Sequence, residues 1–162
     1  MFTLEQKVDL VMRYIASAKP QQDELKKAIV EALNDTGTVV DARTDVANIV
    51  VDIFKEVGVP PHLLGYERSI YAIELAYNDP TYLKSLTKRL YPDIAAKYDT
   101  TPSRVERTIR HAVEVSFDRG DVDAIYNIFG NTISVGKGKL TNGEFLAHIV
   151  VEVRRRLNAA KE

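Results

Sequence analysis

Apolar side chains recur at intervals of three and four residues along most of the sequence, and this spacing limits the possible folds more than any other feature. It places the apolar side chains on one face of an α-helix, whereas a half-buried β-strand alternates at every second residue. No long stretch alternates with a period of two, and the six prolines and eight glycines fall mostly between the helical segments. The sequence therefore predicts an all-α fold with many helices.

Helix breakers and capping residues set the expected boundaries. For example, Gly58 followed by Val59, Pro60 and Pro61 ends a helix that begins near Ala42. The same signals predict helices over about residues 3–17, 21–33, 42–57, 65–78, 81–90, 92–98, 102–117, 122–128 and 142–158. The longest loop is expected over residues 130–141, and a change of composition near residues 35–41 divides the chain. We expect a short helical N-terminal extension over residues 1–38, suited to interaction or dimerisation, and a main domain over residues 39–162.

Composition excludes several classes of function. With 162 residues, of which 45% are hydrophobic, the chain can bury a core of its own. It has no cysteine, and its three histidines lie far apart, so we expect no metal site and no cofactor. We find no nucleophile motif, no phosphate-binding glycine loop and no isolated carboxylate pair, so we expect no catalytic residues and no enzyme activity.

The N-terminus carries charges within its apolar stretch, which is typical of an amphipathic helix and not of a signal peptide. No apolar run approaches the roughly 20 residues that span a bilayer, so we expect a cytoplasmic protein with no membrane partner. The formal net charge of −1 is unusual for a dedicated nucleic-acid-binding domain, since such domains are often strongly basic. Any basic surface must therefore be local.

Residues 92–113 have the pattern of a helix-turn-helix. A short helix follows Pro92, Asp99 stands where such motifs need a residue that tolerates left-handed backbone, and Thr101 and Pro102 begin the next helix. The Thr101 hydroxyl can accept a hydrogen bond from a backbone N–H of the first turn, and Pro102 at the first helical position loses none. Two helices in such close succession make a helix-turn-helix.

On a helical wheel, the second of these helices has two distinct faces. The expected inner face consists of Val105, Ile109, Ala112, Val113 and Ser116. The opposite face is rich in hydrogen-bond donors, with Glu106 at its flank, and consists of Ser103, Arg104, Arg107, Arg110 and His111. Guanidinium groups match the two acceptors of guanine, and a carboxylate can accept from cytosine N4. Such charges on a helix are often only a solvated face, but the preceding helix, the Thr-Pro cap and the segregated faces favour double-stranded DNA as the partner.

Two further basic positions are open to interpretation. Lys137 and Lys139, on either side of Gly138, could contact a DNA phosphate, but a merely solvated loop explains them equally well. The run from Arg154 to Arg156 is explained at least as well by a solvated helix end as by DNA.

Several ordered segments also resemble a known family. They are Glu56-Val57-Gly58-Val59-Pro60-Pro61-His62, Gly65-Tyr66, Tyr77-Asn78-Asp79, Leu90-Tyr91-Pro92-Asp93-Ile94-Ala95, Ser103-Arg104-Val105-Glu106-Arg107 with Ile109-Arg110-His111-Ala112, and Thr141-Asn142 with Glu144-Phe145. Together they resemble the DNA-binding effector domain of the sporulation master response regulator, the stage zero sporulation protein A family of endospore-forming bacteria. The resemblance extends from about Asp41 to the C-terminus.

The resemblance implies a six-helix, all-α effector domain that recognises short operator boxes, often as a tandem homodimer, and that regulates transcription by contacting RNA polymerase. It also implies that Arg104, Glu106, Arg107, Arg110 and His111 lie on the recognition helix. Residues 120–133 correspond to the segment through which the family is thought to contact the polymerase sigma subunit. A nucleoid-associated regulator of sporulation, or of a derived programme, is the expected role.

The resemblance also leads to one expected departure from the family. Its regulator carries a phosphoacceptor receiver domain of alternating strands and helices, but only about 40 residues precede the matching segment here. We therefore expect no receiver and no aspartyl phosphorylation in this chain. An alternative role is a protein interaction module, with an unknown partner for the N-terminal helices, that pairs with a resident sporulation regulator as its antagonist.

Overall fold

The computed structural model describes residues 42–130 and 138–161, together with Thr3, residues 5–9, Arg13 and Lys27. The chain divides into two compact units, Met1–Ala42 and Arg43–Glu162. Within the first unit, residues 5–9 are helical. Most of the predicted helices over residues 3–17 and 21–33 lies outside the described residues, as do residues 131–137 of the predicted loop.

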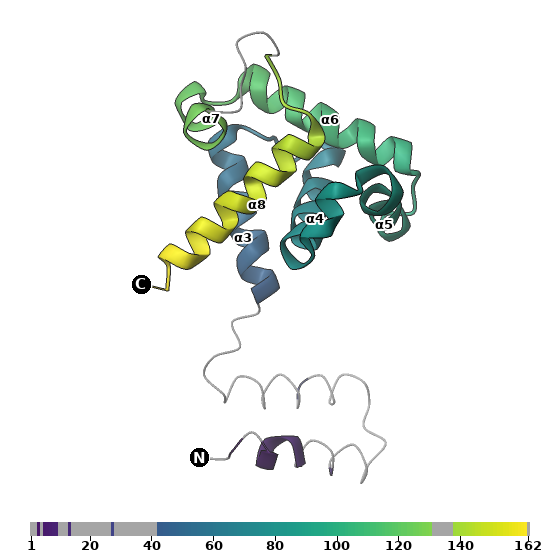
Figure 1. Ribbon diagram of the computed structural model, residues 1–162, viewed down its shortest axis with the longest axis vertical. Helices are drawn as coiled ribbons and strands as arrows, with labels where there is room; N and C mark the ends of the chain where they lie inside the picture. Colours follow the sequence, from purple (N-terminus) through teal and green to yellow (C-terminus); the bar gives the residue numbers. More distant parts are fainter. Residues whose placement is uncertain are drawn as a thin grey trace. The chain divides into compact units, whose positions relative to one another are not determined.

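The described residues between 42 and 159 form six α-helices and two short irregular helices (Figure 1). These are α3 Ala42–Val57, α4 Leu64–Asn78, η1 Pro80–Lys84, η2 Leu86–Leu90, α5 Tyr91–Lys97, α6 Pro102–Arg119, α7 Val122–Phe129 and α8 Asn142–Ala159. No strand occurs in this described part of the chain. The all-α prediction is confirmed, and most helix boundaries agree with the expected ones to within two residues.

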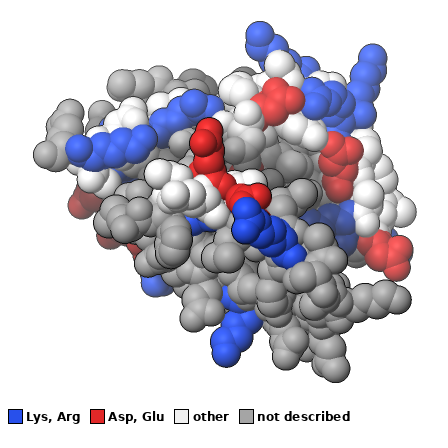
Figure 2. Space-filling model, turned by 90° about the horizontal axis from the view of Figure 1, so that it is seen from below, with Lys and Arg blue, Asp and Glu red and all other residues white. Residues whose placement is uncertain are grey.

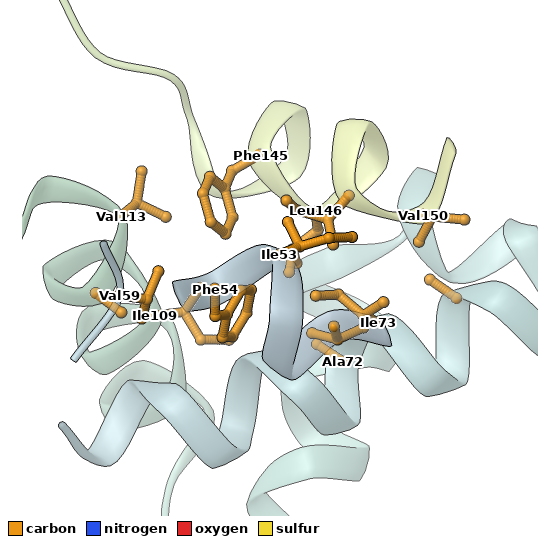
Figure 3. Packing of buried hydrophobic residues seen from close by; sticks show 14 of the residues in the cluster. Ile53, Phe54, Val59, Ala72, Ile73, Ile109, Val113, Phe145, Leu146 and Val150 are labelled. Carbon is orange, nitrogen blue, oxygen red and sulfur yellow. The ribbon is translucent and has the colours of Figure 1, made fainter. Parts of the chain in front are cut away.

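Side chains from α3, α4, α6 and α8 form the centre of one hydrophobic core (Figure 3), to which α5 and α7 also contribute. Ile53 and Phe54 of α3 are fully buried at its centre. Around them lie the buried side chains of Ala72 and Ile73 from α4, Ile109 and Val113 from α6, and Phe145, Leu146 and Val150 from α8. Each large apolar side chain buried in this way contributes about 1.5–3 kcal/mol. The core therefore fixes α6 against the rest of the domain by its inner face.

The C-terminus of α3 is held against the C-terminal end of α6. Gly58 has a φ of 76°, and the Val59 N–H donates to the Phe54 carbonyl over 2.9 Å, which is the Schellman arrangement for ending a helix. The buried Ser116 hydroxyl of α6 donates to the carbonyl of Val57, the last residue of α3, over 2.6 Å. A Cβ on Gly58 would lie only 2.5 Å from Gly120 Cα, so a side chain at this position would push the two helix ends apart.

The prediction of a single helix over residues 81–90 was wrong. Ser85, with φ −144° and ψ 56°, separates η1 from η2. The Arg89 guanidinium returns to the start of the segment, where it donates to Thr81 over 2.7 Å and to the Asp79 carboxylate over 3.1 Å. A straight helix would place Asp79 and Arg89 about 15 Å apart along its axis, so these bonds require the break.

Candidate nucleic-acid interface

The helices α5 and α6 form the predicted helix-turn-helix. In the turn between them, Asp99 has a φ of 48°, in the left-handed region that Asp tolerates better than most residues. The Thr101 hydroxyl accepts a hydrogen bond from the Arg104 N–H over 3.3 Å, and Pro102 is the first residue of α6. The expected features of the turn and of the cap are all present.

The two faces of α6 are separated as the wheel predicts. The inner side chains of Val105, Ile109, Ala112, Val113 and Ser116 are all buried. Ser103, Arg104, Arg107, Arg110 and His111 are all exposed, whereas Glu106 is half-buried. The packed face holds the helix in place, and the hydrogen-bond donors are left open to a ligand.

One ion pair lies at the exposed face of α6. Arg110 Nη1 lies 3.2 Å from Glu106 Oε1, one helical turn away, and such exposed pairs contribute only about 0.3–0.5 kcal/mol. Among the described residues, Arg104 and Arg107 have no ion-pair partner. Their guanidinium groups can therefore bind an external acceptor without first breaking an internal salt bridge.

Asn142, the first residue of α8, ties α6 to α5. Its buried side-chain amide donates to the Tyr91 hydroxyl and to the Glu106 carbonyl, each over 3.1 Å. Burial raises the pKa of Tyr91, while the hydrogen bond from Asn142 lowers it. Thr141 and Glu144 form a capping box at the start of α8, and their spacing in the sequence could predict this helix start. No local sequence pattern indicates the contacts of Asn142, so this positioning role could not be predicted.

The helix α6 also packs closely against the start of α4, through Thr108. A Cβ on Gly65 would lie 2.0 Å from the Thr108 carbonyl oxygen, so only glycine allows this approach without movement of one of the helices. Arg68 donates to the Thr108 hydroxyl over 2.9 Å. The helix α6 is thus supported by α4 and by the start of α8.

A cleft runs along each side of the exposed face of α6. The first, here called the α8 cleft, is lined among others by Thr87, Ser103, Arg110, Glu114, Lys139 and Thr141. The second, called the α4 cleft, is lined among others by His62, Leu64, Arg107, His111 and Glu114. Lys139, which the sequence suggested as a phosphate contact, lies 3.3 Å from the Asp118 carboxylate. Lys137 lies outside the described residues.

The arginines at the end of α8 have partners within the domain. Arg154 donates to the Tyr77 carbonyl over 2.8 Å at the end of α4. Arg156 pairs with Glu56 and Glu152, each over 2.7 Å, and the hydrogen bond to Glu56 raises its pKa above the ordinary value. The face in Figure 2 likewise shows basic and acidic side chains next to one another over the described residues. The arginine run therefore stabilises the packing of α8 and does not form an open basic patch.

Other site types find no support in the described part of the chain. None of its helices combines the length and the apolar character of a membrane span. The described residues also contain no cluster of three or more His, Asp or Glu side chains placed to hold a metal ion.

The comparison with protein families identifies the domain. The family described as "Sporulation initiation factor Spo0A C terminal" matches residues 50–153, which is well over half of the chain. The chain belongs to this family. The match begins within α3, ends within α8 and includes the whole helix-turn-helix. The Spo0A C-terminal domain is a DNA-binding transcriptional effector domain without enzymatic activity, and this is the class of the present domain.

Proposed function

We propose that this domain recognises a specific sequence of double-stranded DNA by placing the N-terminal half of α6 in the major groove. The observation that carries the proposal is the separation of the two faces of α6, because all five predicted inner side chains are buried and the predicted donors are exposed. The major groove is wide enough for an α-helix, and Arg pairs bidentately with the O6 and N7 acceptors of guanine there. Arg104 and Arg107 are our candidates for these base contacts.

The surroundings of α6 suit contacts to the DNA backbone. A helix in the major groove has a phosphodiester strand on each side, and the two clefts flank α6 in the same way. Arg110 lines both clefts and is our candidate for a phosphate contact, and His111 is our candidate for the strand beside the α4 cleft. Thr101 lines neither cleft and remains a sequence-based candidate. Lys139 can contact a phosphate only if its ion pair with Asp118 breaks, and Lys137 remains a sequence-based candidate.

Contacts with other proteins form a second part of the proposal. In α7, the side chains of Val122 and Tyr126 are 79% and 66% exposed, which leaves an apolar strip without a partner among the described residues. Asp121 and Asp123 flank this strip. These features support a role of α7 in contacting the RNA polymerase sigma subunit. Binding as a tandem homodimer and action at the nucleoid complete the proposed role.

A titration of labelled duplexes tests the main proposal. A duplex with the family's operator box and a scrambled duplex are each titrated at two salt concentrations with the wild type, Arg107→Ala and Arg119→Ala. Arg119 is the matched control, because it lies on the same helix about 18 Å further along its axis.

We expect Arg107→Ala to weaken operator binding by about 1–3 kcal/mol and to reduce the preference for the operator. Arg119→Ala should leave that preference unchanged. Equal, salt-sensitive binding of the wild type to both duplexes would refute sequence recognition. It would favour the alternative role as an interaction module that antagonises a resident regulator.

A further inference from the structure

The exposed face of α6 changes its charge along the helix. On a wheel of about 100° per residue, seven side chains lie within about 60° of Arg107. We call this set the outer stripe, and it consists of Ser103, Arg104, Arg107, Arg110, His111, Glu114 and Asp118. Its basic members all precede its acidic members. The outer stripe is therefore basic in the N-terminal part of α6 and acidic in its C-terminal part.

The two acidic side chains of the outer stripe differ in their surroundings. Asp118 is partly neutralised by Lys139, whose Nζ lies 3.3 Å from its carboxylate. Glu114 has no ion-pair partner among the described residues. Its half-buried side chain lines both the α8 cleft and the α4 cleft. Glu114 thus carries an uncompensated negative charge between the two clefts that flank α6.

This position is unfavourable next to a phosphodiester backbone. Glu114 lies seven residues, or about 10 Å, beyond Arg107 along the helix axis. The strands that border a groove of about 12 Å then pass on both sides of this part of α6. Non-specific binding depends almost entirely on attraction to phosphates, whereas operator binding also gains energy from base contacts. A repulsive charge at this position weakens both kinds of binding, and operator binding can offset the loss through its base contacts.

We propose that Glu114 is an affinity-limiting residue, whose carboxylate weakens binding to DNA in general and so makes the base contacts of the N-terminal half of α6 necessary for stable binding. The proposal rests on the proposed function, since it assumes that α6 enters the major groove. It assigns Glu114 no contact with a base.

The test compares Glu114→Gln with the wild type on the operator and scrambled duplexes over a range of salt concentrations. Glu114→Asp keeps the charge, and Asp123→Asn removes one charge from the exposed surface of α7. Arg107→Ala is measured in parallel, and urea unfolding checks that each variant is folded.

We expect Glu114→Gln to bind both duplexes about 3- to 10-fold more tightly, so that the scrambled duplex binds at salt concentrations at which the wild type does not hold it. The plot of log affinity against log salt should steepen by about one unit. Glu114→Asp and Asp123→Asn should behave like the wild type.

Two results would overturn the proposal while leaving the proposed function intact. One is a Glu114→Gln variant with unchanged affinities, although Arg107→Ala weakens operator binding. The other is a loss of operator binding alone in Glu114→Gln, which would make Glu114 a base acceptor. If Arg107→Ala has no effect on the operator, the proposed function fails, and the role of Glu114 fails with it.

Discussion

Two buried serines provide a stringent test of the packing around α6. Ser116 is completely buried and its hydroxyl donates to the Val57 carbonyl over 2.6 Å. Ser69 of α4 is 1% exposed, and its hydroxyl has no hydrogen-bond partner among the described residues. The same substitution, Ser→Ala, therefore removes a satisfied hydroxyl at one position and an unsatisfied one at the other.

The expected free energies follow from this difference. Ser116→Ala should lower the free energy of unfolding by about 1–2 kcal/mol, because it removes a buried hydrogen bond to a carbonyl at a helix end. Ser69→Ala should be neutral or should raise the free energy of unfolding by up to about 1 kcal/mol, because the buried hydroxyl gains nothing in return for its lost hydration.

Urea unfolding followed by circular dichroism measures both changes, and equal m-values for the variants would show that the unfolded states are comparable. Equal destabilisation by the two substitutions would refute the assigned hydrogen bonding, as would a larger effect of Ser69→Ala.

Two other predictions concern the supports of α6 and α8. Asn142→Ala should lower the free energy of unfolding by about 1–2 kcal/mol and should weaken operator binding. The same substitution is also measured in the Tyr91→Phe background. If it lowers the free energy of unfolding there as much as in the wild type, the contact with Tyr91 contributes nothing. Hydrogen bonds from Arg156 and Arg155 lower the pKa values of Glu56 and Glu152, respectively. Because these folded-state values lie below the unfolded ones, the stabilisation is complete above the unfolded pKa and is lost as the pH falls through the folded pKa. As the pH is lowered from about 5 to about 3, the free energy of unfolding should therefore fall more steeply in the wild type than in Arg156→Gln. Parallel plots of this free energy against pH would contradict the role of Arg156 in lowering these pKa values.

The fold and the two faces of α6 could be predicted from the sequence because their determinants are local. The 3.6-residue period fixes which side chains of α6 face inward, and Asp99, Thr101 and Pro102 fix where α6 begins. Gly58 ends α3 for an equally local reason, namely its left-handed backbone.

What the sequence did not predict depends on contacts between distant residues. The break at Ser85 follows from the return of Arg89 to Asp79, and the role of Asn142 follows from its meeting Tyr91 in the folded domain. The pairing of Lys139 with Asp118, and of Arg156 with Glu56, likewise joins separate segments. Periodicity determines the inward face of a helix, but it does not specify which residue of another segment that face contacts.

Modified duplexes can test whether α6 recognises base edges in the major groove. Replacing one guanine of the operator box at a time by 7-deazaguanine removes only the N7 acceptor, which lies in the major groove. We expect at least one such replacement to weaken wild-type binding by roughly 1 kcal/mol or more and to have no further effect on Arg107→Ala. Unchanged wild-type affinity for every substituted duplex would contradict such recognition.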